Sequence, residues 1–174
     1  MKQIQYTMKP QDVVILLKII ATGSDQWQQQ SLADELKMSQ SEVSQSVARS
    51  RFAGLLDGSG KKVMRLAFMD FLQYGLAYAF PQKPGSMVRG VPTAYSAPPL
   101  NAIIQSNELL VWPSAKGKYR GQSILPLYPT VVDAVDKDTK LYQLLALADT
   151  LRVGKAREKE LAISELKKLL LHGE

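Results

Sequence analysis

The 174-residue chain has no cysteine and only one histidine, and these two shortages limit the chemistry that it can support. Without cysteine the chain can form no disulfide, no thiolate metal site and no cysteine nucleophile, which suits a reducing cytoplasm. The histidine, His172, has no second histidine to work with, so the usual catalytic triads and histidine-based metal sites are excluded. We therefore predict that the protein is not an enzyme and uses no metal or cofactor.

Long hydrophobic runs are missing as well. The apolar stretch Val13–Ile20 is interrupted by Lys18 and is far shorter than the ~20 residues that a membrane-spanning helix needs. The first twelve residues, MKQIQYTMKPQD, lack the layout of a signal peptide. We expect a cytoplasmic protein that does not associate with membranes.

The remaining composition is that of an ordinary globular protein with a basic surface. Hydrophobic residues make up 45% of the chain and charged residues 22%, and the excess of Lys and Arg gives a net charge of +6. Between Ser39 and Arg65 there are five basic and two acidic residues. A DNA-binding segment needs such a local excess, although many soluble proteins also carry a basic surface.

The stretch from Gln28 to Val47 has the pattern of two short helices joined by a tight turn. Ser39 is suited to cap the second helix, and Glu42 completes a capping box with it. Lys37 stands in the turn, where the backbone often has a positive φ that a non-glycine residue adopts at a cost. The positions expected to face inward are Ala33, Leu36, Met38, Val43 and Val47.

The second helix, residues 40–51, carries short hydrogen-bonding side chains on its other face. Amides and hydroxyls can read base edges in the major groove, and basic side chains can hold phosphates. A basic hairpin is predicted next, with its tip at residues 57–62 and with strands in GLLD before the turn and KKVMRL after it. The predicted DNA-binding residues are Ser39, Gln40, Ser41, Ser44, Gln45, Arg49, Arg51, Lys61 and Lys62.

The sequence GSGKK in this hairpin superficially resembles a phosphate-binding P-loop. That motif needs a glycine where this chain has Leu55, and a serine or threonine where it has Lys62. A wing turn with two phosphate-seeking lysines is the favoured interpretation.

Residues 28–47 resemble the twenty-residue helix-turn-helix pattern of bacterial and phage repressors, with Lys37 in the place of the usual glycine. The longer stretch from Met8 to about Tyr78, less than half of the chain, is similar to winged-helix regulators of the MarR type. The resemblance implies a winged helix-turn-helix fold, double-stranded DNA as the partner, and a homodimer that binds two half-sites. The remainder of the chain resembles only uncharacterised bacterial winged-helix proteins, which implies no function.

Two further helices are expected around this segment. The first runs from Pro10, which suits a first helical turn, to Thr22, before Gly23. The second covers residues 64–80 and is apolar on most sides, so it contributes to the core or to a dimer contact. Gly75 would allow a second helix to approach it closely.

Residues 81–100 contain five prolines and two glycines, which argues against a regular helix or a central strand. Such a segment is either a functional loop that wraps a partner or a rigid connector. Within it, Arg89 together with Thr93, Tyr95 and Ser96 is a candidate pocket for an anion or a nucleic-acid backbone.

The rest of the chain is predicted to form a small β-hairpin and a C-terminal helical hairpin. The hairpin consists of strands at residues 108–113 and 119–127, and its basic and aromatic side chains either bind nucleic acid or are simply solvated. Helices are expected over residues 130–136, 139–153 and 155–171. The last two pack on each other or against a second subunit.

We predict a mainly α (α+β) protein with a winged helix-turn-helix DNA-binding domain at residues 1–80. Residues 81–174 would serve partner binding or dimerisation. The favoured function is a dimeric, sequence-specific transcriptional regulator that reads the major groove with residues 40–51 and holds phosphates with the wing at residues 57–62. The alternative is an antitoxin-like or adaptor module whose residues 81–174 bind a partner protein. An enzyme acting on nucleic acid is the least favoured function.

Overall fold

The computed structural model describes residues 6–172, and the predicted mainly helical α+β class is confirmed, with 55% of residues in helices. None of the helices in this range combines the length and the apolarity that a bilayer span requires. The helices are α1 (Pro10–Thr22), α2 (Gln29–Leu36), α3 (Gln40–Phe52), α4 (Arg65–Tyr74), α5 (Leu76–Ala79), α6 (Val131–Ala134), α7 (Thr139–Val153) and α8 (Ala156–Leu171). The strands are β1 (Met87–Pro92), β2 (Leu110–Pro113) and β3 (Tyr119–Ser123), and single 3-10 turns lie at 94–96, 100–102 and 135–137.

Helix α1 begins and ends where the sequence predicts. Pro10 occupies the first helical position, where its missing N–H is not needed. Gly23 ends the helix with a φ of 72°, and its N–H donates to the Ile20 carbonyl at 3.1 Å. The side chains of residues 13–17 are all buried, so α1 is a central helix of the core.

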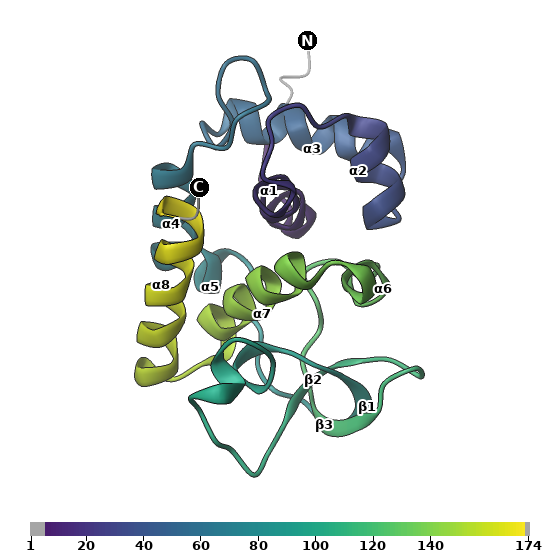
Figure 1. Ribbon diagram of the computed structural model, residues 1–174, viewed down its shortest axis with the longest axis vertical. Helices are drawn as coiled ribbons and strands as arrows, with labels where there is room; N and C mark the ends of the chain where they lie inside the picture. The colour runs from purple at the N-terminus through teal and green to yellow at the C-terminus, as the bar shows by residue number, and fades with distance from the viewer. Residues whose placement is uncertain (1–5, 173–174) are drawn as a thin grey trace.

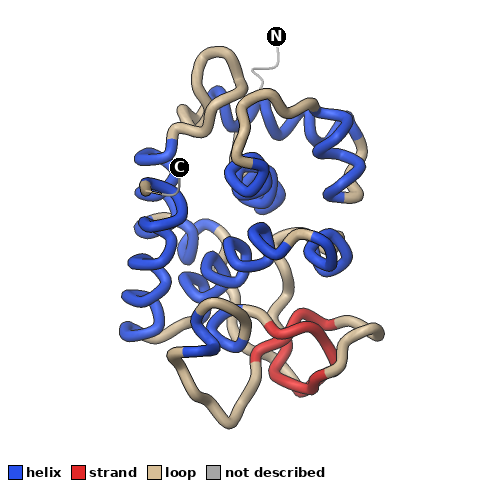
Figure 2. The backbone as a smooth tube through the Cα atoms, in the orientation of Figure 1, coloured by secondary structure: helices blue, strands red, loops and turns tan. Residues whose placement is uncertain are grey.

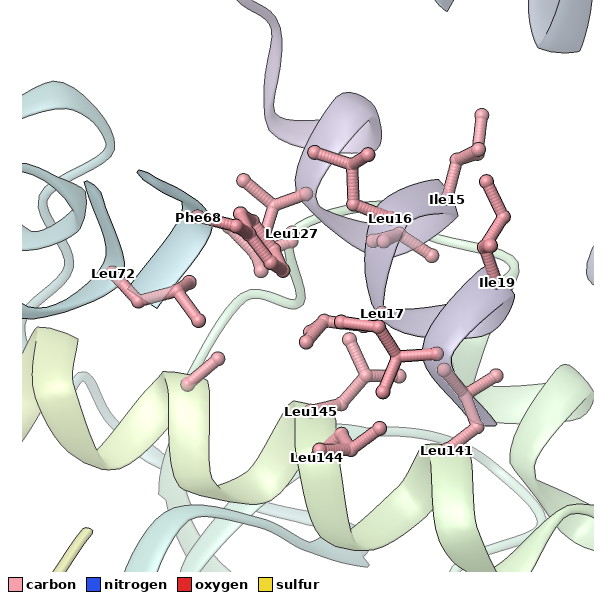
Figure 3. Packing of buried hydrophobic residues seen from close by; sticks show 14 of the residues in the cluster. Ile15, Leu16, Leu17, Ile19, Phe68, Leu72, Leu127, Leu141, Leu144 and Leu145 are labelled. Carbon is pink, nitrogen blue, oxygen red and sulfur yellow. The ribbon is translucent and has the colours of Figure 1, made fainter. Parts of the chain in front are cut away.

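Helix α7 is the second central helix and packs directly against α1 (Figures 1 and 3). Figure 3 shows Leu141, Leu144 and Leu145 of α7 facing Leu16 and Leu17 of α1. All residues from 144 to 151 are buried, so α7 is not an amphipathic surface helix. One continuous hydrophobic core therefore contains residues from before and after residue 80. The domain boundary predicted at residue 80 stays a prediction.

The predicted helix over residues 64–80 is interrupted, and this is a correction. It divides at Gly75 (φ −120°, ψ −32°) into α4 and the short α5. A Cβ on Gly75 would lie only 3.0 Å from the Phe71 ring, so the glycine serves the break itself rather than an approaching helix. Helices α7 and α8 pack together as predicted, and α8 also packs on α4.

The three strands form a small closed barrel at one end of the molecule (Figure 2). Strand β1 is antiparallel to both β2 and β3, while β2 and β3 run parallel to each other. Two predictions are therefore wrong. Residues 108–127 do not form a β-hairpin, and the proline-rich stretch does supply a central strand.

Both errors have local causes. Among residues 81–100, only Pro92 lies in β1, and it is the last residue of the strand. The N–H groups of the other residues of β1 are therefore free to hydrogen bond on both sides. The chain from β2 to β3 does not fold back tightly, because it crosses β1 at Gly90. A Cβ on Gly117 would lie 2.3 Å from the Gly90 backbone, so the crossing requires glycine.

A buried carboxylate attaches the barrel to α7. Asp149 accepts hydrogen bonds from the Thr93 hydroxyl (2.6 Å), the Trp112 indole N–H (2.7 Å) and the Arg152 guanidinium (3.0 Å). Burial raises the pKa of Asp149, although Arg152, Thr93 and Trp112 act in the opposite direction. Breaking this group of contacts is expected to separate the barrel from the helices.

Candidate nucleic-acid interface

The turn between α2 and α3 has the geometry that its sequence predicts. Lys37 adopts a φ of 56°, and Met38 donates its N–H to the Ala33 carbonyl at 2.9 Å. The Ser39 hydroxyl accepts the Glu42 N–H at 3.1 Å and so caps α3. The Glu42 carboxylate does not complete the predicted capping box, because it accepts a hydrogen bond from the Tyr128 hydroxyl at 2.7 Å instead.

Helix α3 separates its two faces as expected. Val43 and Val47 are buried against the core. On the opposite face, the Gln45 amide donates to the Ser41 hydroxyl at 3.3 Å, so these two groups are held side by side. The exposed face, which we call the α3 polar face, consists of Gln40, Ser41, Ser44, Gln45 and Ala48. It offers hydroxyls and amides that can both donate and accept.

Arg49 is not on this face, which corrects the predicted phosphate contact. Its side chain is buried against α1, where Nε and Nη2 donate to the two oxygens of Asp12 at 2.9 and 2.7 Å. Asp12 is itself fully buried and also accepts the Lys9 N–H at 2.8 Å. A bidentate pair in this position fixes α3 on α1, so Arg49 positions the helix and is closed to a ligand.

The predicted wing is a short hairpin loop rather than a pair of strands, which is a further correction. Its ladder is a single bridge between Leu56 and Val63. Asp57 holds the tip, because its carboxylate accepts from the Ser59 hydroxyl at 2.7 Å and from the Lys61 and Lys62 N–H groups. The hydrogen bond from Ser59 and then those from the backbone lower the pKa of Asp57. These local bonds replace the longer ladder that the sequence suggested.

Arg51 connects α3 to this loop. Its guanidinium donates to the Gly58 carbonyl at 2.7 Å, and the side chain remains exposed. Gly60 lies against it with a φ of +75°, and a Cβ there would come within 2.8 Å of the Arg51 side chain. Glycine at position 60 thus serves both the left-handed turn and the contact with Arg51.

The two lysines of the loop differ in their availability. Lys61 donates its ammonium to the Trp27 carbonyl at 2.6 Å and lies 4.3 Å from the centroid of the Trp27 ring. The Trp27 indole returns a hydrogen bond to the Lys61 carbonyl at 2.9 Å. The ammonium of Lys62 is 3.6 Å from Asp25, in a pair whose side chains are both more than half exposed. Lys62 is therefore the more accessible of the two.

Residues from the second half of the chain hold the α2–α3 turn in place. Besides the Tyr128–Glu42 bond, the Thr130 hydroxyl donates to the Leu36 carbonyl at 2.7 Å, where α2 ends. Thr130 stands at the N-cap position of α6, but its side chain contacts α2 and does not cap that helix. The hydrogen bond to Glu42 and then burial raise the pKa of the Tyr128 phenol. Sequence reasoning missed these contacts, since partners 86 and 94 residues apart leave no local pattern.

A buried lysine adds a further contact between α2 and the second half of the chain. The Lys18 ammonium pairs with Asp138 at the start of α7 and with Glu35 of α2, both at 2.5 Å. Burial of Lys18 lowers its pKa, but the hydrogen bonds that its ammonium donates to Asp138 and Glu35 outweigh that effect and leave the pKa above its ordinary value. Lys18 was expected only as an interruption of an apolar run, whereas it joins α1, α2 and α7.

Comparison with protein-family models, with curated proteins and with known structures found no match to this chain. In residues 6–172, no three His, Asp or Glu side chains are grouped so that they could hold a metal ion.

Proposed function

We propose that the protein is a cytoplasmic, sequence-specific DNA-binding regulator of the winged helix-turn-helix type, which reads the major groove with the α3 polar face. The observation that carries this proposal is the exposure of Gln40, Ser41, Ser44 and Gln45 together on one side of a braced helix. Direct readout needs side chains of this type in a fixed orientation, and the contacts of Arg49 and Tyr128 supply that orientation.

The proposed phosphate contacts differ from the simple list of basic residues. Arg51, in the last turn of α3, and Lys62, in the loop that follows, have exposed side chains, whereas Lys61 contributes mainly by holding the loop on Trp27. The first N–H groups of α3, near Ser39 and Gln40, offer a further place for a phosphate. Affinity should then fall steeply with salt, with a slope of about 0.9 for each phosphate contacted.

The test is a binding titration with a labelled fragment from upstream of the protein's own gene and a scrambled fragment of equal length. A preference of about a hundredfold for the native fragment is expected for a specific regulator. Gln45→Ala should reduce this preference by roughly tenfold, since a lost base contact costs about 1–3 kcal/mol of discrimination. Gln26→Ala, which removes an exposed amide outside α3, is the matched control.

Lys62→Ala is the complementary variant, because it removes a phosphate contact and no base contact. It should weaken binding to both fragments equally and lower the salt slope by about one. Equal loss on both fragments for Gln45→Ala as well would remove the α3 polar face from base readout and count against the proposal.

A homodimer is part of this proposal, and an exposed apolar strip on α4 and α5 is the surface for it. Leu66 and Tyr74 of α4 are 73% and 68% exposed, and Tyr78 of the following α5 is 86% exposed. Leu66→Glu should convert a dimer to a monomer in sedimentation equilibrium, while Lys167→Glu on α8 should not. A wild-type protein that sediments as a monomer at micromolar concentration would refute this part of the proposal.

The alternative function, an antitoxin-like or adaptor module, relies on residues 81–174 as the surface that binds a partner protein. The observation in its favour is that the proline-rich segment is built into the barrel, away from α3 (Figure 1). Co-purification of one protein from the native host in stoichiometric amount would favour it over a regulator that acts alone.

A further inference from the structure

Two cavities of similar volume differ in the charge of the side chains that line them. The barrel cavity, of about 530 Å³, is lined only by uncharged residues, among them Tyr95, Tyr119 and Tyr142. The second cavity, of about 580 Å³, lies between the end of α1, the loop that follows α3 and the start of α7. We call it the cationic cavity, because its charged lining residues are Asp25, Lys61, Lys62, Arg65 and Lys140.

The cations of this cavity come from segments that are far apart in the sequence. Lys61 and Lys62 belong to the loop that follows α3, Arg65 is the first residue of α4, and Lys140 is the second residue of α7. Because the Lys61 ammonium is held by Trp27, it contributes charge rather than a free donor. Folding therefore concentrates positive charge in one concave site, and such a site attracts anions.

Most of this charge is not compensated. Within residues 6–172 no ion pair involves Arg65 or Lys140, although Arg65 donates to the Leu170 carbonyl at 2.9 Å. Lys62 has only its exposed pair with Asp25, at 3.6 Å. Four basic side chains and one carboxylate leave the lining with a net charge of +3.

Two of the cations stand in positions that are unfavourable for their own helices. Arg65 and Lys140 each lie in the first turn of a helix, where the helix dipole disfavours a positive charge. The end of α1, which carries the opposite partial charge, also borders the cavity and offsets part of this effect. An anion in the cavity would stabilise both cations further.

The rest of the lining is partly apolar. It includes the side chains of Ile19, Ile20 and Val63. The volume of about 580 Å³ exceeds what a bare phosphate ion fills and falls in the range of small-molecule sites, roughly 300–1,000 Å³. Cations next to apolar side chains suit a ligand that has an anionic group and an uncharged body.

We propose that the cationic cavity binds a small organic phosphate, with the phosphate group on Lys62, Arg65 and Lys140 and the uncharged body against Val63. A phosphate dianion suits this set, because guanidinium and ammonium groups form strong charge-assisted hydrogen bonds with phosphate oxygens. The backbone of a duplex suits it less well, since Arg65 and Lys140 are half-buried in a concave site. The inference does not depend on the proposed reading of DNA by α3, although Lys62 is common to both.

The first experiment is isothermal titration calorimetry of the full chain with phenyl phosphate, which should bind saturably to one site per chain. Lys140→Gln should weaken this binding about tenfold, because one charge-assisted hydrogen bond to the phosphate is lost. The matched control, Lys137→Gln, removes the same charge from an exposed position just before α7 and outside the cavity. It should change the affinity by less than about twofold. No saturable binding by the wild type, or equal weakening by both variants, would overturn the proposal.

Two related ligands test the two halves of the proposed ligand. Benzenesulfonate keeps the ring but carries a single charge, and inorganic phosphate keeps the charge but lacks the ring. Both should bind more weakly than phenyl phosphate at the same ionic strength. If benzenesulfonate binds as tightly, the assignment to a phosphate is wrong, and if inorganic phosphate binds as tightly, the assignment of an uncharged body to the apolar lining is wrong.

The competing explanation is that the cations serve only the end of α1. Lys140→Gln would then lower the melting temperature without ligand and leave the affinity for phenyl phosphate unchanged, which would overturn the proposal. A ligand site predicts the reverse, namely a similar melting temperature without ligand and a smaller rise with phenyl phosphate than in the wild type. If Lys140→Gln does not fold, Lys62→Gln, at an exposed position, provides the same test.

A DNA backbone carries the same phosphate chemistry, and Lys140→Gln distinguishes the two sources. Weaker binding of phenyl phosphate with unchanged affinity for the upstream duplex supports a separate site for a small ligand. Weaker duplex binding by this variant, together with no binding of phenyl phosphate by the wild type, would assign the cavity to the DNA backbone and overturn the inference. A wild type that binds phenyl phosphate but prefers no duplex would refute the proposed function and still support this site.

Discussion

The α3 region and the barrel differ in what their cations already contact. Around α3, Arg49 is closed in a buried pair with Asp12, Lys61 is held by Trp27, and Lys62 lies near Asp25. On the barrel, Arg89 and Arg120 face each other with no carboxylate partner in the described part of the chain. A run of basic residues in a sequence therefore indicates charge but not whether that charge is available to a ligand.

The basic side chains of the two regions also differ in whether they stabilise the fold. In the α2–α3 region the basic side chains hold secondary-structure elements together, and the side chains left exposed are mostly uncharged. In the barrel the elements are held together by the buried Asp149 and by close glycine contacts, so its surface arginines have no structural task. Four variants sharpen or break this comparison.

The largest effect is expected for Arg49→Ala. Removal of the guanidinium leaves the Asp12 carboxylate buried and unpaired, which should cost about 3–5 kcal/mol of unfolding free energy. Urea denaturation followed by circular dichroism measures this loss, and Arg51→Ala, two residues further along α3, should cost less than about 1 kcal/mol. Unchanged stability together with weaker, less salt-sensitive DNA binding would return Arg49 to the role of a phosphate contact.

Asp149→Ala should have the next largest effect, about 3 kcal/mol, because the buried Thr93 hydroxyl and Trp112 indole N–H lose their acceptor and Arg152 loses its ion pair. The loss should fall mainly on the barrel. Trp112 reports on it in a Trp27→Phe background, since the chain has two tryptophans. Asp149→Asn keeps one acceptor oxygen and avoids a buried charge, so it should be milder. A loss of helical circular dichroism that coincides with the Trp112 red shift in Asp149→Ala would show instead that the barrel and the helices unfold as one unit.

An alkaline titration probes the wall of the barrel cavity. Burial, and then the nearby Tyr119, raise the pKa of Tyr142 from 10.0 to about 12. Since the folded-state pKa is raised, the stabilisation is complete below pH 10.0 and is lost as the pH rises through about 12. Absorbance near 295 nm should show a late step that Tyr142→Phe removes. A wild-type titration complete near the ordinary tyrosine value would contradict the packing of this wall.

The smallest effect is a stabilisation by Ser46→Ala. The Ser46 hydroxyl is buried on α3 and has no hydrogen-bond partner among the described residues, as is also the case for Ser50. Alanine removes the unsatisfied hydroxyl and has a higher helix propensity, so a gain of about 1 kcal/mol is expected. Ser44→Ala, on the exposed side of α3, should leave stability nearly unchanged while it weakens DNA binding. A loss of stability in Ser46→Ala would mean that its hydroxyl does find a partner in solution.

The sequence predicted best the features that depend on near neighbours. The start of α1 at Pro10, its end at Gly23, the left-handed Lys37 and the Ser39 cap are all set within a few residues, and each is confirmed. The apolar positions from Ala33 to Val47 are buried for the same reason, because helical periodicity is local. Once the buried positions of α3 are known, the positions of its exposed polar face are known as well.

The sequence predicted worst the features that depend on distant partners. Arg49 looked like a surface cation because its partner Asp12 lies 37 residues earlier, although an acidic residue next to the apolar run of α1 was a usable signal. Strand β1 was hidden among prolines, and the parallel pairing of β2 with β3 depends on a crossing at Gly90. The Arg89–Arg120 pair follows only from that register.

The packing of α1 on α7 also determines when the chain can complete its core during translation. The apolar residues of α1 leave the ribosome early. Asp138, the partner of Lys18, and the leucines of α7 that cover α1 are synthesised about 120 residues later. At translation rates of ~5–20 residues per second, the nascent chain would expose part of this apolar surface for about 6–24 seconds. The α2–α3 turn, which residues 128–138 brace, can reach its final rigidity only when that interval ends. Ribosome-bound chains that stop before α7 should therefore recruit chaperones, and chains that include α7 should release them.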